Sequence, residues 1–211
     1  MIKVVIFDFD GTLADTFDII VGITNRLSVE FGYRPARKEE IPEIQKLNPL
    51  QVINQSGISI FKLPFLLRRI RLEVQKEIER VSLFWGIKEV LWELKEQGYK
   101  LGIITSNGRE NVEVVLQKND LLIFDFIVAG TTLFGKHKVI KKYLKANNMQ
   151  PEEVIYVGDE ARDINAAKKA KTKVIGVTWG FNSKEALSEY QPDALIDEPQ
   201  ELITKINDFC S

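Results

Sequence analysis

Apolar residues along this 211-residue chain alternate between short continuous runs and longer amphipathic stretches. The short runs are rich in β-branched residues and apolar at nearly every position, as strands covered on both faces must be. The longer stretches carry their apolar residues on one face, which is typical of helices packed against a sheet. The predicted strands are 2–7, 101–105, 126–129, 154–157 and 174–177, and the predicted helices are 87–97, 110–119, 138–147 and 161–170.

The alternation of strand and helix predicts an α/β fold, in which a parallel sheet is covered by helices on both faces. One stretch interrupts this alternation. Between about residues 15 and 83 the pattern is helical, with no convincing strand, and from Leu66 to Val81 apolar residues recur at four-residue spacing. We therefore expect a three-layer core of residues 1–14 and 84–211, with a small all-helical domain of residues 15–83 inserted after the first strand.

The composition is that of an ordinary globular protein, with 45% hydrophobic residues. A net charge of −1 gives no basic excess for binding nucleic acid or an anionic membrane. No apolar run approaches the length of roughly 18–20 residues that a membrane span needs. The single cysteine, Cys210, excludes an internal disulfide and fits a reducing compartment. These features predict a cytoplasmic protein, monomeric or homodimeric, with no nucleic-acid or membrane partner.

In open parallel sheets of this kind, ligand-binding and catalytic sites lie at the carboxyl ends of the strands. The first predicted strand is followed by Asp8-Phe9-Asp10-Gly11-Thr12. Residues i and i+2 of an extended chain point to the same side, so Asp8 and Asp10 are held together, and their repulsion calls for a cation or a shared proton. Gly11 permits a sharp turn or a close approach of the backbone to a ligand. Taken alone, Asp10-Gly11 is interpreted equally well as a simple turn.

The second predicted strand ends in Thr105-Ser106-Asn107-Gly108. The hydroxyl groups and exposed backbone N–H groups of such a segment can hold phosphate oxygens. By itself, however, the segment is more typical of the N-terminal cap of the next helix.

The fourth predicted strand brings further carboxylates to the same edge, in Asp159, Glu160 and Asp163. Hard cations such as Mg²⁺ prefer oxygen ligands of this type. Acids at a helix N-terminus are also favoured by the helix dipole, which explains Glu160. The dipole does not explain why the first and fourth strands both end in acids.

A lysine follows the third predicted strand, in Phe134-Gly135-Lys136-His137. A cation at this place could neutralise phosphate charge and pair with the carboxylates. Further lysines follow closely, which favours a solvated basic helix face for most of them. His137, the only histidine, is left without a role.

Together these segments resemble the four motifs of the haloacid dehalogenase-like (HAD) superfamily. The matching segments are DFDGT at 8–12, IITSN at 103–107, Lys136 and GDEARD at 158–163, in the family's order and spacing across nearly the whole chain. DFDGTLADT and VIYVGDEARD resemble the phosphoglycolate phosphatase-like hydrolases in particular. The resemblance implies a Rossmann-like core with a C1-type helical cap. It also implies a Mg²⁺-dependent phosphatase that hydrolyses a small phosphate monoester, such as phosphoglycolate, through an aspartyl-phosphate.

The same resemblance implies a role for each residue. Asp8 would be the nucleophile, and Asp10 would protonate the leaving group and then deprotonate the attacking water. Lys136 would clamp the phosphate and orient Asp8. Because many relatives have Lys-Pro where this chain has Lys136-His137, Lys138 is a fallback candidate for this role. The residues expected to contact the phosphate are Gly11, Thr105, Ser106, Asn107 and Lys136.

Mg²⁺ would be bound by the Asp8 side chain, the Asp10 main-chain carbonyl and Asp159. Asp163, or Glu160 in its place, would support the lysine or a metal-bound water. The helical insertion would close over the site as a lid, excluding water during phosphoryl transfer. Its polar candidates for contacting the leaving group are Arg34, Arg37, Lys38, Asn48, Gln51 and Asn54, although most such side chains are simply solvated.

Several alternatives share these motifs. A phosphomutase would differ only in how well the insertion shields the aspartyl-phosphate, and a dehalogenase fits less well because Asp10 is present. A non-catalytic binding protein could keep the fold without the chemistry. A phosphatase acting on nucleic-acid ends is weakly allowed by the lysines that follow Lys136 but is disfavoured by the net charge.

Overall fold

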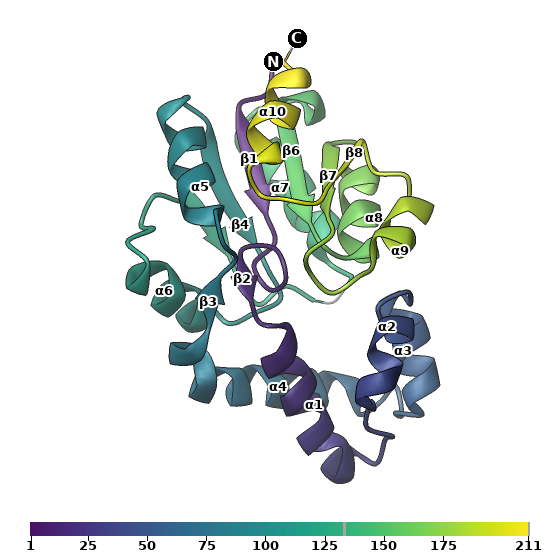
Figure 1. Cartoon of the computed structure of the whole chain (residues 1–211). Helices are drawn as coiled ribbons and strands as arrows, with labels where there is room; N and C mark the ends of the chain where they lie inside the picture. Colours follow the sequence, from purple (N-terminus) through teal and green to yellow (C-terminus); the bar gives the residue numbers. More distant parts are fainter. Residues whose placement is uncertain (133, 211) are drawn as a thin grey trace.

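A parallel sheet of six strands forms the centre of the molecule in the computed structural model, which describes residues 1–132 and 134–210 (Figure 1). Its strand order is β5-β4-β1-β6-β7-β8. The strands are β1 (Val4–Phe7), β4 (Lys100–Ile104), β5 (Phe126–Val128), β6 (Val154–Gly158), β7 (Lys173–Val177) and β8 (Ala194–Ile196). All five predicted strands are present, with ends within two residues of the prediction. The three-residue edge strand β8 was not predicted, because so short a run leaves almost no pattern.

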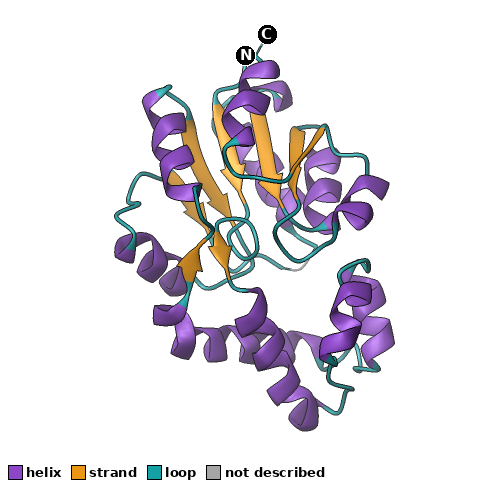
Figure 2. Ribbon diagram, in the orientation of Figure 1, coloured by secondary structure: helices purple, strands orange, loops and turns teal. Residues whose placement is uncertain are grey.

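Helices cover both faces of this sheet and give the predicted three layers (Figure 2). On one face lie α5 (Ile87–Glu96), α6 (Arg109–Lys118) and α10 (Glu201–Asp208), and on the other lie α7 (Lys136–Ala146), α8 (Ala161–Ala170) and α9 (Lys184–Glu189). α8 begins and ends where the periodicity predicts, whereas α7 begins two residues earlier than predicted. The helices α9 and α10 were not predicted.

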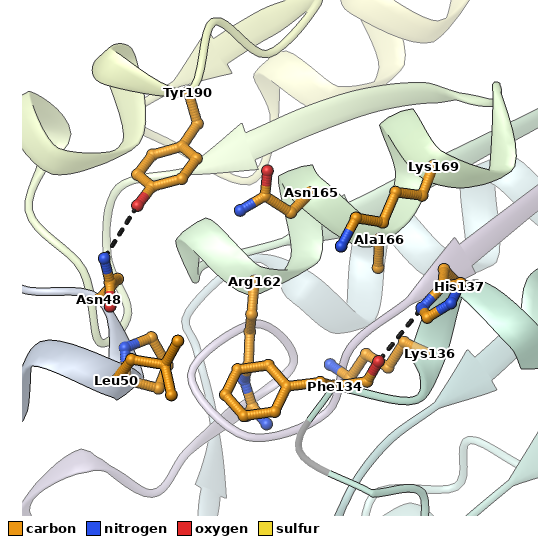
Figure 3. A pocket seen from close by; sticks show the side chains of 11 residues that line it. Asn48, Leu50, Phe134, Lys136, His137, Arg162, Asn165, Ala166, Lys169 and Tyr190 are labelled. Atoms are coloured by element: carbon orange, nitrogen blue, oxygen red, sulfur yellow. Dashed lines mark hydrogen bonds between the residues drawn. The ribbon is translucent and has the colours of Figure 1, made fainter. Parts of the chain in front are cut away.

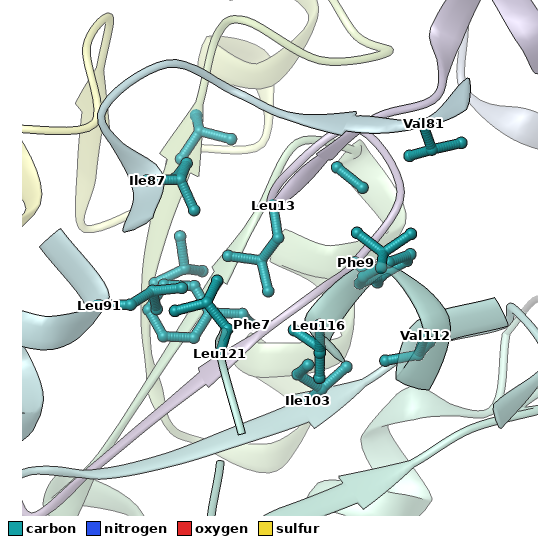
Figure 4. Close-up of a cluster of buried hydrophobic side chains, with 14 of the residues drawn as sticks. Phe7, Phe9, Leu13, Val81, Ile87, Leu91, Ile103, Val112, Leu116 and Leu121 are labelled. Atoms are coloured by element: carbon teal, nitrogen blue, oxygen red, sulfur yellow. The ribbon is translucent and has the colours of Figure 1, made fainter. Parts of the chain in front are cut away.

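Side chains of β1 alternate between two hydrophobic clusters, one on each face of the sheet. Val5 and Phe7 belong to the cluster beneath α5, α6 and α10, and Val4 and Ile6 belong to the cluster beneath α7, α8 and α9. Figure 4 shows the first cluster, in which Phe7 packs near residues from distant segments, including Leu121. Burying one such side chain contributes about 1.5–3 kcal/mol. Because both faces are covered, the strand is apolar at every position.

The insertion contains helices α1 (Phe17–Phe31), α2 (Ile41–Ile44), α3 (Pro49–Ser56) and α4 (Leu63–Glu77), with the 3₁₀ turns η1 (Lys38–Glu40) and η2 (Ile78–Arg80). Helices α1 and α4 lie side by side through apolar residues that include Ile23 and Val74 (Figure 1). The prediction of no strand in this region was wrong at its two ends. Ala14–Asp15 (β2) pairs antiparallel with Ser82–Leu83 (β3), closing the entry and exit of the insertion. Two-residue strands are too short to leave a periodic signal.

All strands of the large sheet point toward the insertion, and the two chain termini lie at the opposite end of the core (Figure 1). The carboxyl ends of β1, β4 and β6 are therefore grouped at the edge that faces helices α1 to α4. No helix within residues 1–132 and 134–210 is both long and apolar enough to cross a bilayer.

Candidate active site

The chain leaves β1 through a tight turn that carries the two aspartates. Asp8 is buried, with 1% of its surface exposed, and its Oδ1 accepts a hydrogen bond of 2.7 Å from the Phe9 N–H. The turn closes through the Leu13 and Ala14 N–H groups, both of which donate to the Phe9 carbonyl at 2.9 Å. The local turn thus holds the Asp8 carboxylate at the end of a central strand.

The structure places Lys136, and not Lys138, against Asp8. It is the first residue of α7 and is 2% exposed, whereas Lys138 is exposed. Its Nζ forms an ion pair with Asp8 Oδ2 and donates to Asp163 Oδ1 at 2.6 Å. Burial lowers the pKa of Lys136, but the facing carboxylates of Asp163 and Asp8 outweigh it and raise the pKa overall. The lysine therefore keeps its charge between two acids.

Asp10 has an unusually high pKa for an aspartate. Burial and the neighbouring charge of Asp8 raise the pKa of Asp10 to about 6, against the lowering effect of a hydrogen bond from Asn107. In that bond Asn107 Nδ2 donates to Asp10 Oδ1 at 2.9 Å. A carboxyl group with a pKa near neutrality can give and take a proton at working pH.

The end of β4 contributes a network of polar groups. Thr105 is fully buried, and its Oγ1 accepts a hydrogen bond of 3.0 Å from the Asn107 N–H. Asn107 Oδ1 accepts from Asn111 Nδ2 at 2.8 Å, which fixes the amide that holds Asp10. Ser106 between them is partly exposed. The Asn107 side chain, expected to contact phosphate, is thus occupied with positioning Asp10.

Asp159, at the end of β6, is enclosed by two glycines. Its Oδ1 accepts from Thr12 Oγ1 at 2.6 Å and its Oδ2 from the Phe181 N–H at 2.8 Å. A Cβ atom at Gly11 would lie 2.2 Å from Asp159 Oδ2, and one at Gly180 would lie 2.3 Å from it. Gly11 also has a φ of +75°, which disfavours other residues. The backbone approaches Asp159 so closely that only glycine fits at either place.

The acidic cluster has the donor set of a divalent-cation site. Asp8, Asp159 and Asp163 are buried, and each offers a carboxylate oxygen within 4.8 Å of the others. Burial, together with the charges of Glu160, Asp8 and Asp163, raises the pKa of Asp159 well above its ordinary value. Oxygen ligands and an excess of buried negative charge fit a hard cation. Asp8 and Asp163 each have one carboxylate oxygen paired with Lys136, whereas the oxygens of Asp159 accept from Thr12 and the Phe181 N–H.

Glu160 and several uncharged residues have partners that the sequence did not indicate. Glu160 pairs with Arg162, whereas Asp163 pairs with Lys136. Thr12 lay inside a recognised motif but was given no role. Phe181 and its neighbour Asn182 follow β7, a strand end without charged residues, so no chemical signal marked them.

Three of the six polar candidates in the insertion bond to other residues of the insertion. Arg34 pairs with Glu40, and Asn48 and Gln51 exchange hydrogen bonds that cap α3. Asn48 Nδ2 also donates to Tyr190 Oη at 3.2 Å, which joins the insertion to the core. The remaining candidates, Arg37, Lys38 and Asn54, are exposed.

Comparison with known proteins agrees with this geometry. Residues 5–177 match the family model described as haloacid dehalogenase-like hydrolase. The chain is 32% identical over 205 residues to a phosphoglycolate phosphatase from Synechococcus elongatus, covering 97% of each sequence. It is 30% identical over 209 residues to the pyrophosphatase PpaX from Bacillus velezensis, covering 96% of this chain and 95% of PpaX.

A solved structure shares the arrangement as well. A haloacid dehalogenase-like family hydrolase from Streptococcus pneumoniae superposes with a TM-score of 0.78 at 25% identity, covering 97% of this chain and 98% of the other. Sequence motifs, strand order and relatives named as phosphatases therefore agree. The chain belongs to the haloacid dehalogenase-like hydrolase family and is a phosphatase.

Proposed function

We propose that this phosphatase hydrolyses a small phosphate monoester through an aspartyl-phosphate and depends on Mg²⁺. The observation that carries the proposal is the buried Asp8 carboxylate, paired with Lys136 and placed beside Asp10, whose pKa is raised to about 6. The names of the two relatives, a phosphoglycolate phosphatase and a pyrophosphatase, support a small and highly charged substrate.

In the proposed reaction a carboxylate oxygen of Asp8 attacks phosphorus while the bond from phosphorus to the leaving-group oxygen breaks. Asp10 gives its proton to that oxygen, and in the second half takes a proton from the water that hydrolyses the acyl phosphate. Lys136 offsets the charge of Asp8 and of the phosphoryl oxygens, since phosphoryl transfer depends mainly on positioning and charge neutralisation. Thr105 and the backbone of Gly11 and Ser106 hold phosphoryl oxygens.

We propose that the Asp8 side chain, the Asp10 main-chain carbonyl and Asp159 hold Mg²⁺, with Asp163 and Glu160 in support. When bound, the ion would neutralise charge between the nucleophile and the phosphate. The hydrogen bonds from Thr12 and the Phe181 N–H keep Asp159 oriented for this role.

We further propose that residues 15–83 are a cap domain over a core of residues 1–14 and 84–211. Polar contacts join the two parts at several places, and Asn182 makes some of them. Its Nδ2 donates to the Gln45 and Leu47 carbonyls at 2.9 Å each, while its Oδ1 accepts from the Ala161 N–H at the start of α8. Contacts of this kind can break when a lid opens to exchange substrate and product.

Metal binding should change the pH dependence of stability. The folded-state pKa of Asp10 and Asp159 lies above the ordinary value, so the metal-free folded protein binds protons more tightly than the unfolded chain. The stability that these two groups contribute is therefore full below about pH 4, and the part due to Asp10 is lost as the pH rises through about 6. We expect saturating Mg²⁺ to raise the melting temperature by about 5 °C at pH 8 and by much less at pH 5.

Thermal unfolding followed by circular dichroism, with Mg²⁺ or with a chelator, measures this effect. Asp159→Asn should abolish the Mg²⁺-dependent rise at pH 8, whereas Asp193→Asn, which removes a surface ion pair with Lys173, should keep it. An equal rise at both pH values, or a full rise in Asp159→Asn, would contradict the proposed metal site.

A screen of phosphate compounds tests the function itself. We expect Mg²⁺-dependent release of phosphate from small esters or from pyrophosphate, and loss of that release with a chelator. The phosphomutase alternative is separated by incubating a hexose phosphate and looking for an isomeric product. Isomerisation that outpaces phosphate release would overturn the proposed hydrolysis.

A further inference from the structure

A cavity of about 200 Å³ lies where the start of α3 meets α7 and α8 (Figure 3). Asn48 and Leu50 border it from the insertion, and Lys136, Arg162 and Lys169 border it from the core. Among the described residues that line it there are basic side chains and amides but no carboxylate. The cavity is therefore positively charged, unlike the acidic cluster next to it, and could bind an anion.

Arg162 is a second buried cation of this cavity, beside Lys136. Its side chain is 10% exposed, and one nitrogen, Nη2, donates to Glu160 Oε1. Within residues 1–132 and 134–210, neither Nε nor Nη1 has a hydrogen-bond partner. Figure 3 shows the side chain extending from α8 into the cavity that Phe134 and Lys136 also line. Buried donors without partners are costly, and a guanidinium is well suited to an anionic oxygen ligand.

The cavity adjoins the phosphoryl-transfer position. Lys136 lines it and also pairs with Asp8, so an anion in the cavity would lie next to the group attached to the reacting phosphorus. Glu160 uses only one edge of the guanidinium and so anchors it, leaving the other donors for a ligand. Lys169, on the same face of α8, adds positive charge farther from Asp8.

We infer that Arg162 recognises a second anionic group on the leaving part of the substrate. The substrate class is then a phosphate compound whose leaving group itself carries a carboxylate or a phosphate. This inference rests on the proposed phosphatase function and deepens it, because it assigns specificity to the α8 side of the core in addition to the insertion.

The test compares two nearly isosteric esters, 2-phosphoglycolate and 2-hydroxyethyl phosphate, which differ by a carboxylate in place of a hydroxymethyl group. Pyrophosphate is the third compound, and it shows whether the second anionic group that Arg162 recognises is a phosphate or a carboxylate. We expect Arg162→Gln to lower kcat/KM about 10- to 100-fold for at least one of the two anionic compounds and less than threefold for hydroxyethyl phosphate. Arg162→Lys should recover part of the loss, since it restores the charge with fewer donors.

Arg80→Gln is the matched control, because Arg80 is an exposed arginine that also pairs with a glutamate, Glu77. It should leave the preference unchanged. Equal losses on all three compounds in Arg162→Gln, or no loss on any, would overturn the inference, because either result removes the link to a second anion.

Calorimetry in an inactive Asp8→Asn background separates this inference from the proposed function. We expect Arg162→Gln to weaken binding of the anionic ester selectively, whether or not turnover occurs. Selective binding without turnover by the wild-type chain would contradict the proposed function alone. Turnover with no selective loss of affinity in Arg162→Gln would contradict the inference alone.

Discussion

Replacing Asp8 with asparagine should lower turnover of a phosphate ester by at least about 10⁴-fold while the protein stays folded. An amide has no free charge with which to attack phosphorus, and it cannot form the acyl phosphate. Asparagine has nearly the size of aspartate, so the buried position at the end of β1 should remain filled. Steady-state release of nitrophenolate from an aryl phosphate, with circular dichroism as the check of folding, measures the effect.

Asp18→Asn is the matched control for this substitution. Asp18 is exposed on the first turn of α1, so its replacement should change turnover by less than about twofold. Beryllofluoride with Mg²⁺ should bind the wild-type chain as a mimic of the phosphorylated aspartate and should not bind Asp8→Asn. Wild-type-like turnover in Asp8→Asn would disprove the mechanism, and failure of the wild-type chain to bind beryllofluoride would favour a non-catalytic binding protein.

Replacing Lys136 with methionine should impair both stability and activity. Methionine fills a similar volume but leaves the Asp8 and Asp163 carboxylates buried without their cation. Breaking a buried pair in this way costs about 3–5 kcal/mol. Activity should fall by about 10³-fold or more, because the charge that offsets nucleophile and phosphate is lost. Urea unfolding at pH 7 and turnover at saturating Mg²⁺ give the two measurements.

Lys138→Met serves as the comparison on the same helix, because Lys138 is exposed two residues farther along α7. We expect it to keep near wild-type stability and turnover. The stability deficit of Lys136→Met should also shrink from pH 7 to pH 5, since burial raises the pKa of Asp163 to about 7 and protonation relieves that unpaired carboxylate. A larger loss of activity in Lys138→Met than in Lys136→Met would reverse the assignment of the lysine.

The large sheet was predictable because its strands are buried on both faces. Short continuous apolar runs rich in β-branched residues, such as 154–157, are typical of such strands when longer helical stretches separate them. β8, β2 and β3 were missed for the opposite reason, since two- or three-residue strands owe their conformation to a neighbouring strand. Helix α8 was predicted to the residue because its period and its acidic first turn agree.

Lysine 136 shows how the prediction of the site depended on a helix boundary. The buried residues of α7 are Lys136, Ile140 and Leu144, spaced four apart on one face. The sequence pattern started this helix at 138, which left Lys136 outside the periodicity and Lys138 as a fallback candidate. Once α7 begins at Lys136, the helical repeat of 3.6 residues places the Lys136 side chain on the same buried face as Ile140 and Leu144.

The sequence alone determined the parallel fold, the family resemblance and the gathering of Asp8, Asp10, Thr105 and Asp159 at one sheet edge. These follow from local patterns, because both the apolar run of a buried strand and the residue that follows the strand can be identified from a short segment of sequence. The tertiary structure alone decided the partners, such as Asn107 for Asp10 and Glu160 for one edge of Arg162. Which buried charges form pairs depends on how segments far apart in the chain are placed in the fold. The free energy of burying each charge depends in turn on its partners.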